Sequence, residues 1–230
     1  MKRLLLLSIL VVVLSMPAGA RAGLQEVMDF YDKVQALLAT TNYDALEKTI
    51  DTLRRNDQHF AGGVSGTYLF YRAVGDRPLY SNLWNANRSR GITEEEFRVQ
   101  RARLEAWRRA RPDSSAARTA LANLFHDYAW AARGTDYSPK VTTRQWSDFR
   151  ERLAVVEELL DGAVPADPGM YQLMLRFSRD TSRPRASLEK VYKSAVAKYP
   201  SYFHFYIQYA NLLQTKWFGQ PGEMEAYIKS

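Results

Sequence analysis

Residues 143–160 read TRQWSDFRERLAVVEELL, and this stretch indicates the fold most clearly. Its large apolar side chains recur at steps of three and four residues, which places them on one face of an α-helix. Gly162 follows the last of them, as is typical of a helix end. The stretch predicts an amphipathic helix whose buried stripe consists of Trp146, Phe149, Leu153, Val156 and Leu160.

The same spacing recurs along most of the chain, and no segment alternates apolar and polar residues convincingly as a strand would. Asn42, Asp167 and the pair Thr93 and Glu96 are typical of helix starts, the last as a capping box. Residues 55–92 are the exception, because several glycines flank an aromatic patch there; we expect one short helix in that region and loops around it. Helices are predicted over residues 24–38, 43–53, 97–107, 115–133, 143–160, 168–177, 184–199 and 201–213.

A repeating register links these predicted helices. Pro112, Pro168 and Pro200 each precede a new helix, and a small residue lies ten positions after each proline. Proline disfavours helical geometry in the residue before it, and a small side chain at a fixed depth lets a paired helix approach closely. The register predicts antiparallel helix pairs that stack through three small residues, namely Ala122, Ser178 and Ala210.

This register resembles the tetratricopeptide repeat, whose unit is a helix–turn–helix of about 34 residues. Pro168 and Pro200 are 32 residues apart, whereas Pro112 and Pro168 are 56 apart and require an inserted loop. The segments 115–117 (SAA), 128–134 (YAWAARG) and 217–223 (WFGQPGE), with Trp146, also resemble an uncharacterised bacterial family, domain of unknown function 4034, over about residues 100–230. Both resemblances imply an all-α fold of antiparallel helix pairs stacked as a short tetratricopeptide-like solenoid, without catalytic residues.

The first residues predict export. Lys2 and Arg3 precede an apolar run from Leu4 to Leu14, and small residues follow Pro17, as in a secretory signal peptide. The run would span roughly 16 Å as a helix, about half of a bilayer core. We therefore expect cleavage after Ala20 or Ala22, a periplasmic or secreted protein, and no transmembrane segment in the mature chain. The predicted organisation is a signal peptide over 1–22, helices with an irregular glycine-containing segment over 23–92, and a tetratricopeptide-like domain over 93–230.

The composition excludes most ready-made chemistry. The chain has no cysteine and only three histidines, which excludes disulfides, thiolate zinc sites and cysteine nucleophiles, and no cofactor motif is present. The formal net charge is +7, but export argues against nucleic acid as the partner.

Each candidate for catalysis has a structural explanation. His126 and Asp127 are adjacent on a predicted helix and point about 100° apart, so a surface pair or an interhelical hydrogen bond is expected. His204 is expected to pack among aromatic residues, and His59 to lie in a loop. Ser65 stands in GVSGT, which misses the spacing of a nucleophile elbow, and no strand–turn–helix context is expected around it. The acids at 94–96 are explained by the helix dipole rather than by glycan cleavage.

Arginines concentrate over residues 88–111. Arg98, Arg101 and Arg108 are expected near one helix face, beside Trp107, where guanidinium groups bind carboxylate or phosphate. The competing interpretation is a solvated face balanced by Glu94, Glu95, Glu96 and Glu105. If the arginines bind a ligand, an acidic envelope polymer or an acidic protein partner is expected.

Aromatic residues crowd positions 199–218, where Tyr202 and Tyr206 are the candidate binding residues. A helix that is aromatic on nearly all sides either lies between two neighbours or offers a groove to a peptide. We expect the last residues, 221–230, to pack on this helix and to leave an apolar end suited to self-association.

The sequence therefore predicts an exported, non-enzymatic protein-binding or assembly module built on a helical repeat, with a protein partner or a second copy of itself. An arginine-lined binder of anionic cell-envelope material is the first alternative. A hydrolase whose site the sequence does not reveal is the second.

Overall fold

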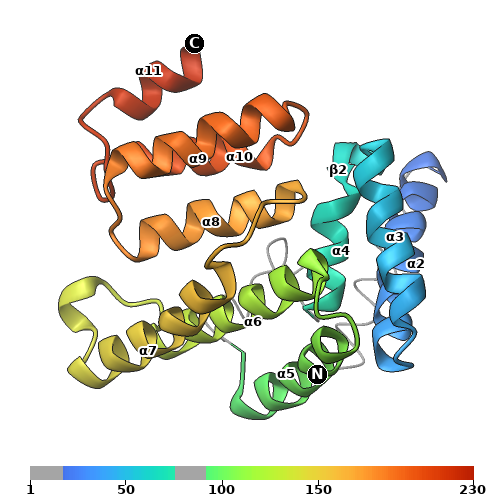
Figure 1. The fold of residues 1–230 in the computed structure, drawn as a ribbon. Helices are drawn as coiled ribbons and strands as arrows, with labels where there is room; N and C mark the ends of the chain where they lie inside the picture. The colour runs from blue at the N-terminus through green and yellow to red at the C-terminus, as the bar shows by residue number, and fades with distance from the viewer. Residues whose placement is uncertain (1–17, 76–91) are drawn as a thin grey trace, which may run out of the picture.

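The computed structural model describes residues 18–75 and 92–230. These residues form helices and one very small hairpin, which confirms the all-α prediction (Figure 1). Most of the predicted signal peptide, and the arginines at 88 and 90, lie outside the described residues. The elements are α2 (Ala18–Ala39), α3 (Tyr43–Asn56), β1 (His59–Phe60), η1 (Ala61–Gly63), β2 (Val64–Ser65), α4 (Gly66–Val74), α5 (Glu94–Ala110), α6 (Ser115–Arg133), η2 (Ser138–Lys140), α7 (Thr143–Leu160), α8 (Pro168–Asp180), α9 (Arg185–Lys198), α10 (His204–Leu212) and α11 (Glu223–Lys229).

Several helices begin at the predicted capping residues. Asn42 Oδ1 accepts a hydrogen bond from the backbone N–H of Ala45 at 3.2 Å, and Asp167 Oδ1 accepts one from Met170 at 3.1 Å. Thr93 and Glu96 form the predicted capping box, with contacts of 3.2 and 2.9 Å. These contacts satisfy backbone donors that have no partner within the helix.

One predicted start is wrong. Helix α7 begins at Thr143 as predicted, behind a second capping box between Thr142 and Gln145. Ser201 does not cap α10, which begins at His204 after Phe203; the Ser201 hydroxyl donates instead to Asp57 Oδ2 at 2.5 Å. Ser201 precedes an apolar run, and that position predicts a helix cap. Its hydroxyl instead bonds a residue that is distant in the sequence.

The irregular region contains the expected short helix, α4, but also strands that the sequence pattern does not predict. Strands β1 and β2 are two residues each and pair antiparallel, with Phe60 opposite Val64. Gly62 and Gly63 turn the chain between them with φ of 77° and 75°, a conformation that side chains with a Cβ rarely adopt. Strands this short leave no room for an alternating pattern.

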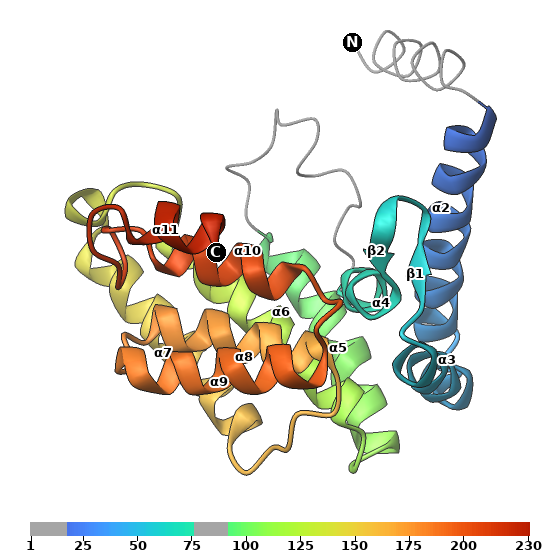
Figure 2. The ribbon, with the colours of Figure 1, turned by 90° about the horizontal axis from the view of Figure 1, so that it is seen from above.

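The helices lie in a serial stack with a separate group at one side. Helices α8, α9 and α10 lie roughly parallel beside α6 and α7, with α11 beyond them, and α2, α3 and α4 lie together at the other side (Figures 1 and 2). Helices that are two apart in the chain also contact each other: α6 contacts α8, and α8 contacts α10. A tetratricopeptide-like solenoid stays a prediction.

The predicted repeat residues fall on those three contacting helices. Ala122 in α6 and Ser178 in α8 are buried, and Ala210 in α10 is half-buried. The three prolines lie in or just before the helices that they were expected to precede: Pro168 is the buried first residue of α8, whereas Pro112 and Pro200 are exposed before α6 and α10.

Apolar side chains form two cores that meet at α8. The larger core gathers side chains from α2 to α8, and the smaller core those of α8, α9 and α10. Leu173 and Phe177 belong to the larger core and Leu175 to the smaller one, so opposite sides of α8 serve different cores. The larger core includes residues from both sides of the predicted boundary at residue 92. In residues 18–75 and 92–230, no helix combines the length and the apolarity that crossing a membrane requires.

Candidate functional site

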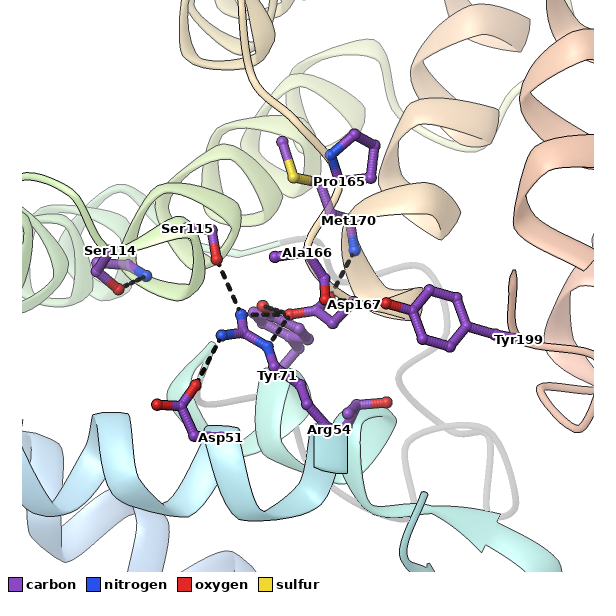
Figure 3. Close-up of polar contacts among 12 residues, drawn as sticks. Asp51, Arg54, Tyr71, Ser114, Ser115, Pro165, Ala166, Asp167, Met170 and Tyr199 are labelled. Carbon is purple, nitrogen blue, oxygen red and sulfur yellow. Dashed lines mark hydrogen bonds and ion pairs between the residues drawn. The ribbon is translucent and has the colours of Figure 1, made fainter. Parts of the chain in front are cut away.

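A buried polar cluster, here called the polar junction, joins side chains of α3, α4 and α6 to Asp167 at the start of α8 (Figure 3). Asp167 begins α8 and is only 1% exposed. Its Oδ2 accepts hydrogen bonds from Arg54 Nε at 3.0 Å and Arg54 Nη2 at 2.6 Å. The hydroxyl of Tyr71 donates to the same oxygen at 2.6 Å. A single carboxylate therefore fastens α3 and α4 to α8.

The remaining groups of the junction are also occupied. Arg54 Nη2 donates to Ser115 Oγ at 3.0 Å, and Arg54 Nη1 pairs with Asp51 at 3.1 Å. The second carboxylate oxygen of Asp167 accepts from the backbone of Met170. Because each polar group already has a partner inside the protein, we interpret the junction as a structural fastening rather than an open site.

Burial and charge act together at the junction. Burial alone would lower the pKa of Arg54, but electrostatic interactions with Tyr71 and Asp167, together with hydrogen bonds to them, outweigh burial and raise that pKa above its usual value. Burial and the neighbouring carboxylate raise the pKa of Tyr71 well above its ordinary range. The junction is therefore an ion pair with a neutral phenol donor.

A second buried carboxylate, Asp180 at the end of α8, is the hydrogen-bond partner of the buried His126 side chain. His126 Nε2 contacts Asp180 Oδ2 at 2.7 Å, which is the interhelical hydrogen bond that the sequence predicts as one outcome. Trp130 Nε1 donates to the same oxygen at 2.7 Å, and Arg179 Nε donates to Oδ1 at 2.5 Å. Burial opposes ionisation of Asp180, but the hydrogen bonds from His126 and Arg179 lower its pKa to about 2. The Nδ1 atom of His126 lies 3.8 Å from Oδ1 of its neighbour Asp127.

The two remaining histidines each have contacts of their own. His59 is exposed, and its Nδ1 lies 2.7 Å from the carbonyl oxygen of Asp57. His204 stacks on Tyr68 with ring centroids 4.1 Å apart, and burial with nearby Arg72 lowers its pKa to about 4.

Ser65 requires a correction, because β2 ends at Ser65 and α4 follows at once, so a strand–helix context is present. Its buried hydroxyl is hydrogen-bonded to Thr67 Oγ1 at 2.9 Å. In the described part of the chain, no three or more His, Asp or Glu side chains lie close enough together to hold a metal ion.

The arginine face of α5 is largely paired with its own glutamates. Arg98 contacts Glu95 at 2.7 Å with both side chains about 70% exposed, and Arg101 contacts Glu105 at 2.7 Å. Arg108 is half-buried and, with Arg109, lines a shallow hollow of about 350 Å³ that also touches Glu105, Pro112 and Leu121. Because exposed pairs contribute little, this face is compatible with the balanced, solvated interpretation.

Two aromatic candidates for binding lie in the core, which corrects the expectation that they face a partner. Trp107 has no exposed surface, and its Nε1 donates to Glu47 at 2.8 Å. Tyr202 is 1% exposed and donates to Gln172 Oε1 at 2.7 Å. Large rings at these positions fill space between helices, and the spacing pattern of a single chain does not distinguish that role from ligand binding.

The C-terminal residues pack as predicted on the aromatic helices. Tyr227 of α11 shares a hydrogen bond of 2.6 Å between hydroxyls with Tyr192, whose ring stacks on Tyr209 at 3.9 Å. Arg185 holds Glu223 at the start of α11 with two hydrogen bonds. Tyr206 is half-buried, and its hydroxyl donates to the Pro200 carbonyl at 3.0 Å.

Four large apolar side chains between residues 203 and 228 stay exposed. Phe203 and Ile207 are 41% and 53% exposed one helical turn apart, and Trp217 and Ile228 are 38% and 64% exposed. Helices α10 and α11 contact each other. We call these four residues the C-terminal apolar surface. The sequence predicts an exposed apolar end here, and Ile228 is exposed as expected. It does not predict the exposure of Phe203, Ile207 and Trp217 individually, although the aromatic density of residues 199–218 marks the region.

The arrangement places the chain in the class of all-α proteins. Comparison with protein-family models finds no match, and comparisons with curated proteins and with solved structures find none either. The resemblances to tetratricopeptide repeats and to domain of unknown function 4034 therefore stay predictions from the sequence.

Proposed function

We propose that this chain is an exported, non-enzymatic protein-binding or assembly module. The observation that carries the proposal is the C-terminal apolar surface. Exposed large apolar side chains that gather on one part of a protein mark interaction sites more often than scattered ones do. Of the eight large hydrophobic residues that are exposed in residues 18–75 and 92–230, four belong to this surface.

Helix α11 is fastened to the helices beside it. The stacked pair Tyr192 and Tyr209 lies against Tyr227, and the ion pair between Arg185 and Glu223 anchors the start of α11. A helix held by such contacts loses little conformational freedom when a partner covers its exposed residues. The polar side chains of the junction, and Arg98 and Arg101 on α5, have partners within the chain, which directs attention to the apolar residues.

The test compares partner capture by matched variants. Purified protein is used to capture partners from the secreted and envelope fractions of the source cells, and its mass is measured by light scattering. Ile207→Glu and Ile228→Glu should abolish capture or self-association. The control is Val164→Glu, which adds the same charge at a residue that is 80% exposed in the connection before α8.

Two results would contradict the proposal. One is a wild-type protein that stays monomeric and captures no partner. The other is equal capture by all three glutamate variants, because binding would then not use the C-terminal apolar surface.

Export itself is tested by fusing residues 1–22 to a reporter and measuring its secretion.

The hollow beside Arg108 and Arg109 supports a second candidate function, the binding of anionic envelope material. Arg98 and Arg101 already contact glutamates, so reversing Arg108 to Glu is the sharper test. That variant should weaken binding to an anionic polymer and reduce its dependence on salt, while capture through the C-terminal apolar surface should be unchanged. A polymer that binds wild type and Arg108→Glu equally would remove this candidate.

A further inference from the structure

Five side chains from distant parts of the chain form an alternating stack of tryptophan and arginine. The guanidinium carbon of Arg133 lies 5.2 Å from the ring centroid of Trp146 and 5.4 Å from that of Trp130. The guanidinium of Arg179 lies 5.4 Å from Trp130 and 4.8 Å from Trp217. We call this arrangement the Trp–Arg stack. These distances are typical of cation–π contacts.

The rings of the stack are held in place by the surrounding helices. Trp130 and Arg133 come from α6, Trp146 from α7, and Arg179 from α8. The rings of Trp130 and Trp146 pack edge-on against Phe149, with centroids 5.3 and 5.8 Å away. The Trp130 indole is further fixed by its hydrogen bond to buried Asp180. The two rings that flank Arg133 therefore have little freedom to move.

Of the two arginines in the stack, Arg179 forms an ion pair with a carboxylate and Arg133 forms none among the described residues. Arg179 pairs with Asp180, a carboxylate with no exposed surface. Arg133 has no carboxylate within ion-pair distance among residues 18–75 and 92–230; its Nη1 donates to the carbonyl oxygens of Gly134 and Asp136. Arg133 is half-buried, so part of it is open to solvent. The stack therefore presents one positively charged group without a matching negative charge.

We propose that Arg133, held between Trp130 and Trp146, binds a carboxylate in an acidic segment of the partner protein. This inference rests on the proposed protein-binding function and names the chemistry of the segment. A guanidinium fork matches the two oxygens of a carboxylate and is always charged. The flanking indoles already fix the arginine, so binding costs little side-chain entropy.

The other end of the stack favours a polypeptide as the ligand. Trp217 belongs both to the Trp–Arg stack and to the C-terminal apolar surface. A segment that carries a carboxylate near aromatic or aliphatic side chains would use both features. A uniformly charged polymer would use Arg133 alone and leave the apolar residues uncovered.

The probe for this site is a random copolymer of glutamate and tyrosine, with polyglutamate and alginate as acidic comparisons. Binding is followed by tryptophan fluorescence and by titration calorimetry. Arg133→Lys keeps the charge but loses the planar fork, and Trp146→Leu keeps Arg133 but removes one flanking ring. Each should weaken copolymer binding by roughly tenfold, as expected for a charge-assisted contact. Thermal unfolding of each variant is measured beside binding.

The matched controls are Arg98→Lys and Arg98→Met on α5, where the side chain is 70% exposed and paired with Glu95. They should bind the copolymer within about twofold of wild type, because exposed pairs contribute little. Arg133→Lys that binds like wild type would overturn the inference, since charge alone would then explain binding. Equal affinity for alginate would overturn it as well, since the ligand would then not need to be a polypeptide.

The capture experiment separates this inference from the proposed function. Partner capture that survives both Arg133→Lys and Trp146→Leu, but not Ile207→Glu, would refute the role of Arg133 and leave the protein-binding function intact. A wild-type protein that captures nothing would refute the proposed function instead.

Discussion

Replacing Asp167 with asparagine would remove one charge from the polar junction while preserving the shape of the side chain. Asparagine is also a good helix cap, so the hydrogen bond to Met170 should persist. Arg54 would then be left as a largely buried cation, 17% exposed, whose strongest partner is gone. Breaking a buried ion pair by neutralising one partner typically costs about 3–5 kcal/mol, and we expect Asp167→Asn to lower the free energy of unfolding by that amount.

The assay is urea unfolding near neutral pH, followed by circular dichroism. The midpoint should fall while the slope of free energy against urea stays unchanged, because the surface exposed on unfolding is the same. Asp167→Ala should cost about 1 kcal/mol more, since it also removes the cap. Glu95→Gln is the control, because it breaks an ion pair whose side chains are about 70% exposed, and the urea midpoint should scarcely move.

A double-mutant cycle isolates the ion pair. Arg54→Met should also be destabilising, because it leaves the Asp167 carboxylate, only 1% exposed, with fewer donors. The double variant Arg54→Met with Asp167→Asn should lose less stability than the two single variants added together. The reasoning fails if Asp167→Asn costs no more than Glu95→Gln, or if the effects at residues 54 and 167 simply add.

Three further predictions concern acid stability and close packing. His204 packs against Tyr68 and Tyr202 near Arg72, and its pKa is lowered to about 4 from 6.5. As the pH drops, the unfolded chain therefore binds a proton at this residue before the folded protein does, and the free energy of unfolding should fall between pH 6.5 and pH 4. In His204→Phe this slope should be shallower in urea midpoints measured across that range; an unchanged slope would contradict the assignment. The pKa of Asp180 is lowered to about 2 from 3.8, so its contribution is present above about pH 4 and is lost toward pH 2, and Asp180→Asn should remove that part of the acid transition measured by circular dichroism. A Cβ on Gly219 would lie 1.7 Å from the carbonyl oxygen of Leu213, so Gly219→Ala should displace the turn and alter the emission of Trp217; an unchanged spectrum and melting temperature would show that the turn tolerates the methyl group.

Local sequence predicts the helices because their causes are local. The stripe from Trp146 to Leu160 and the capping box of Thr93 and Glu96 each depend on residues a few positions apart, and the structure has both. The small residues Ala122 and Ser178 are buried on α6 and α8, which contact each other. Here a periodic pattern is sufficient, because helix geometry fixes which side chains share a face.

Contacts between distant residues are the part that the sequence does not predict. Asp167 is correctly predicted as a cap, but its second partner, Arg54, is 113 residues away. The same holds for Trp107, whose burial depends on neighbours from other helices, and for the Trp–Arg stack, which combines α6, α7, α8 and the turn after α10. A one-residue change in helix register would separate these groups, and periodicity does not specify the register between helices.

The distance along the chain between Arg54 and Asp167 has a consequence for biogenesis. Because a chain is synthesised from its N-terminus, α3 and α4 are made long before α8. Arg54 and Tyr71 therefore lack their carboxylate partner until the last third of the polypeptide has been made. Contacts of such long range form late, because closing a long loop costs entropy before any contact compensates for it. A ribosome-stalled chain that stops short of residue 167 should therefore leave Arg54 without its carboxylate partner and more accessible to proteolysis than in the 230-residue chain.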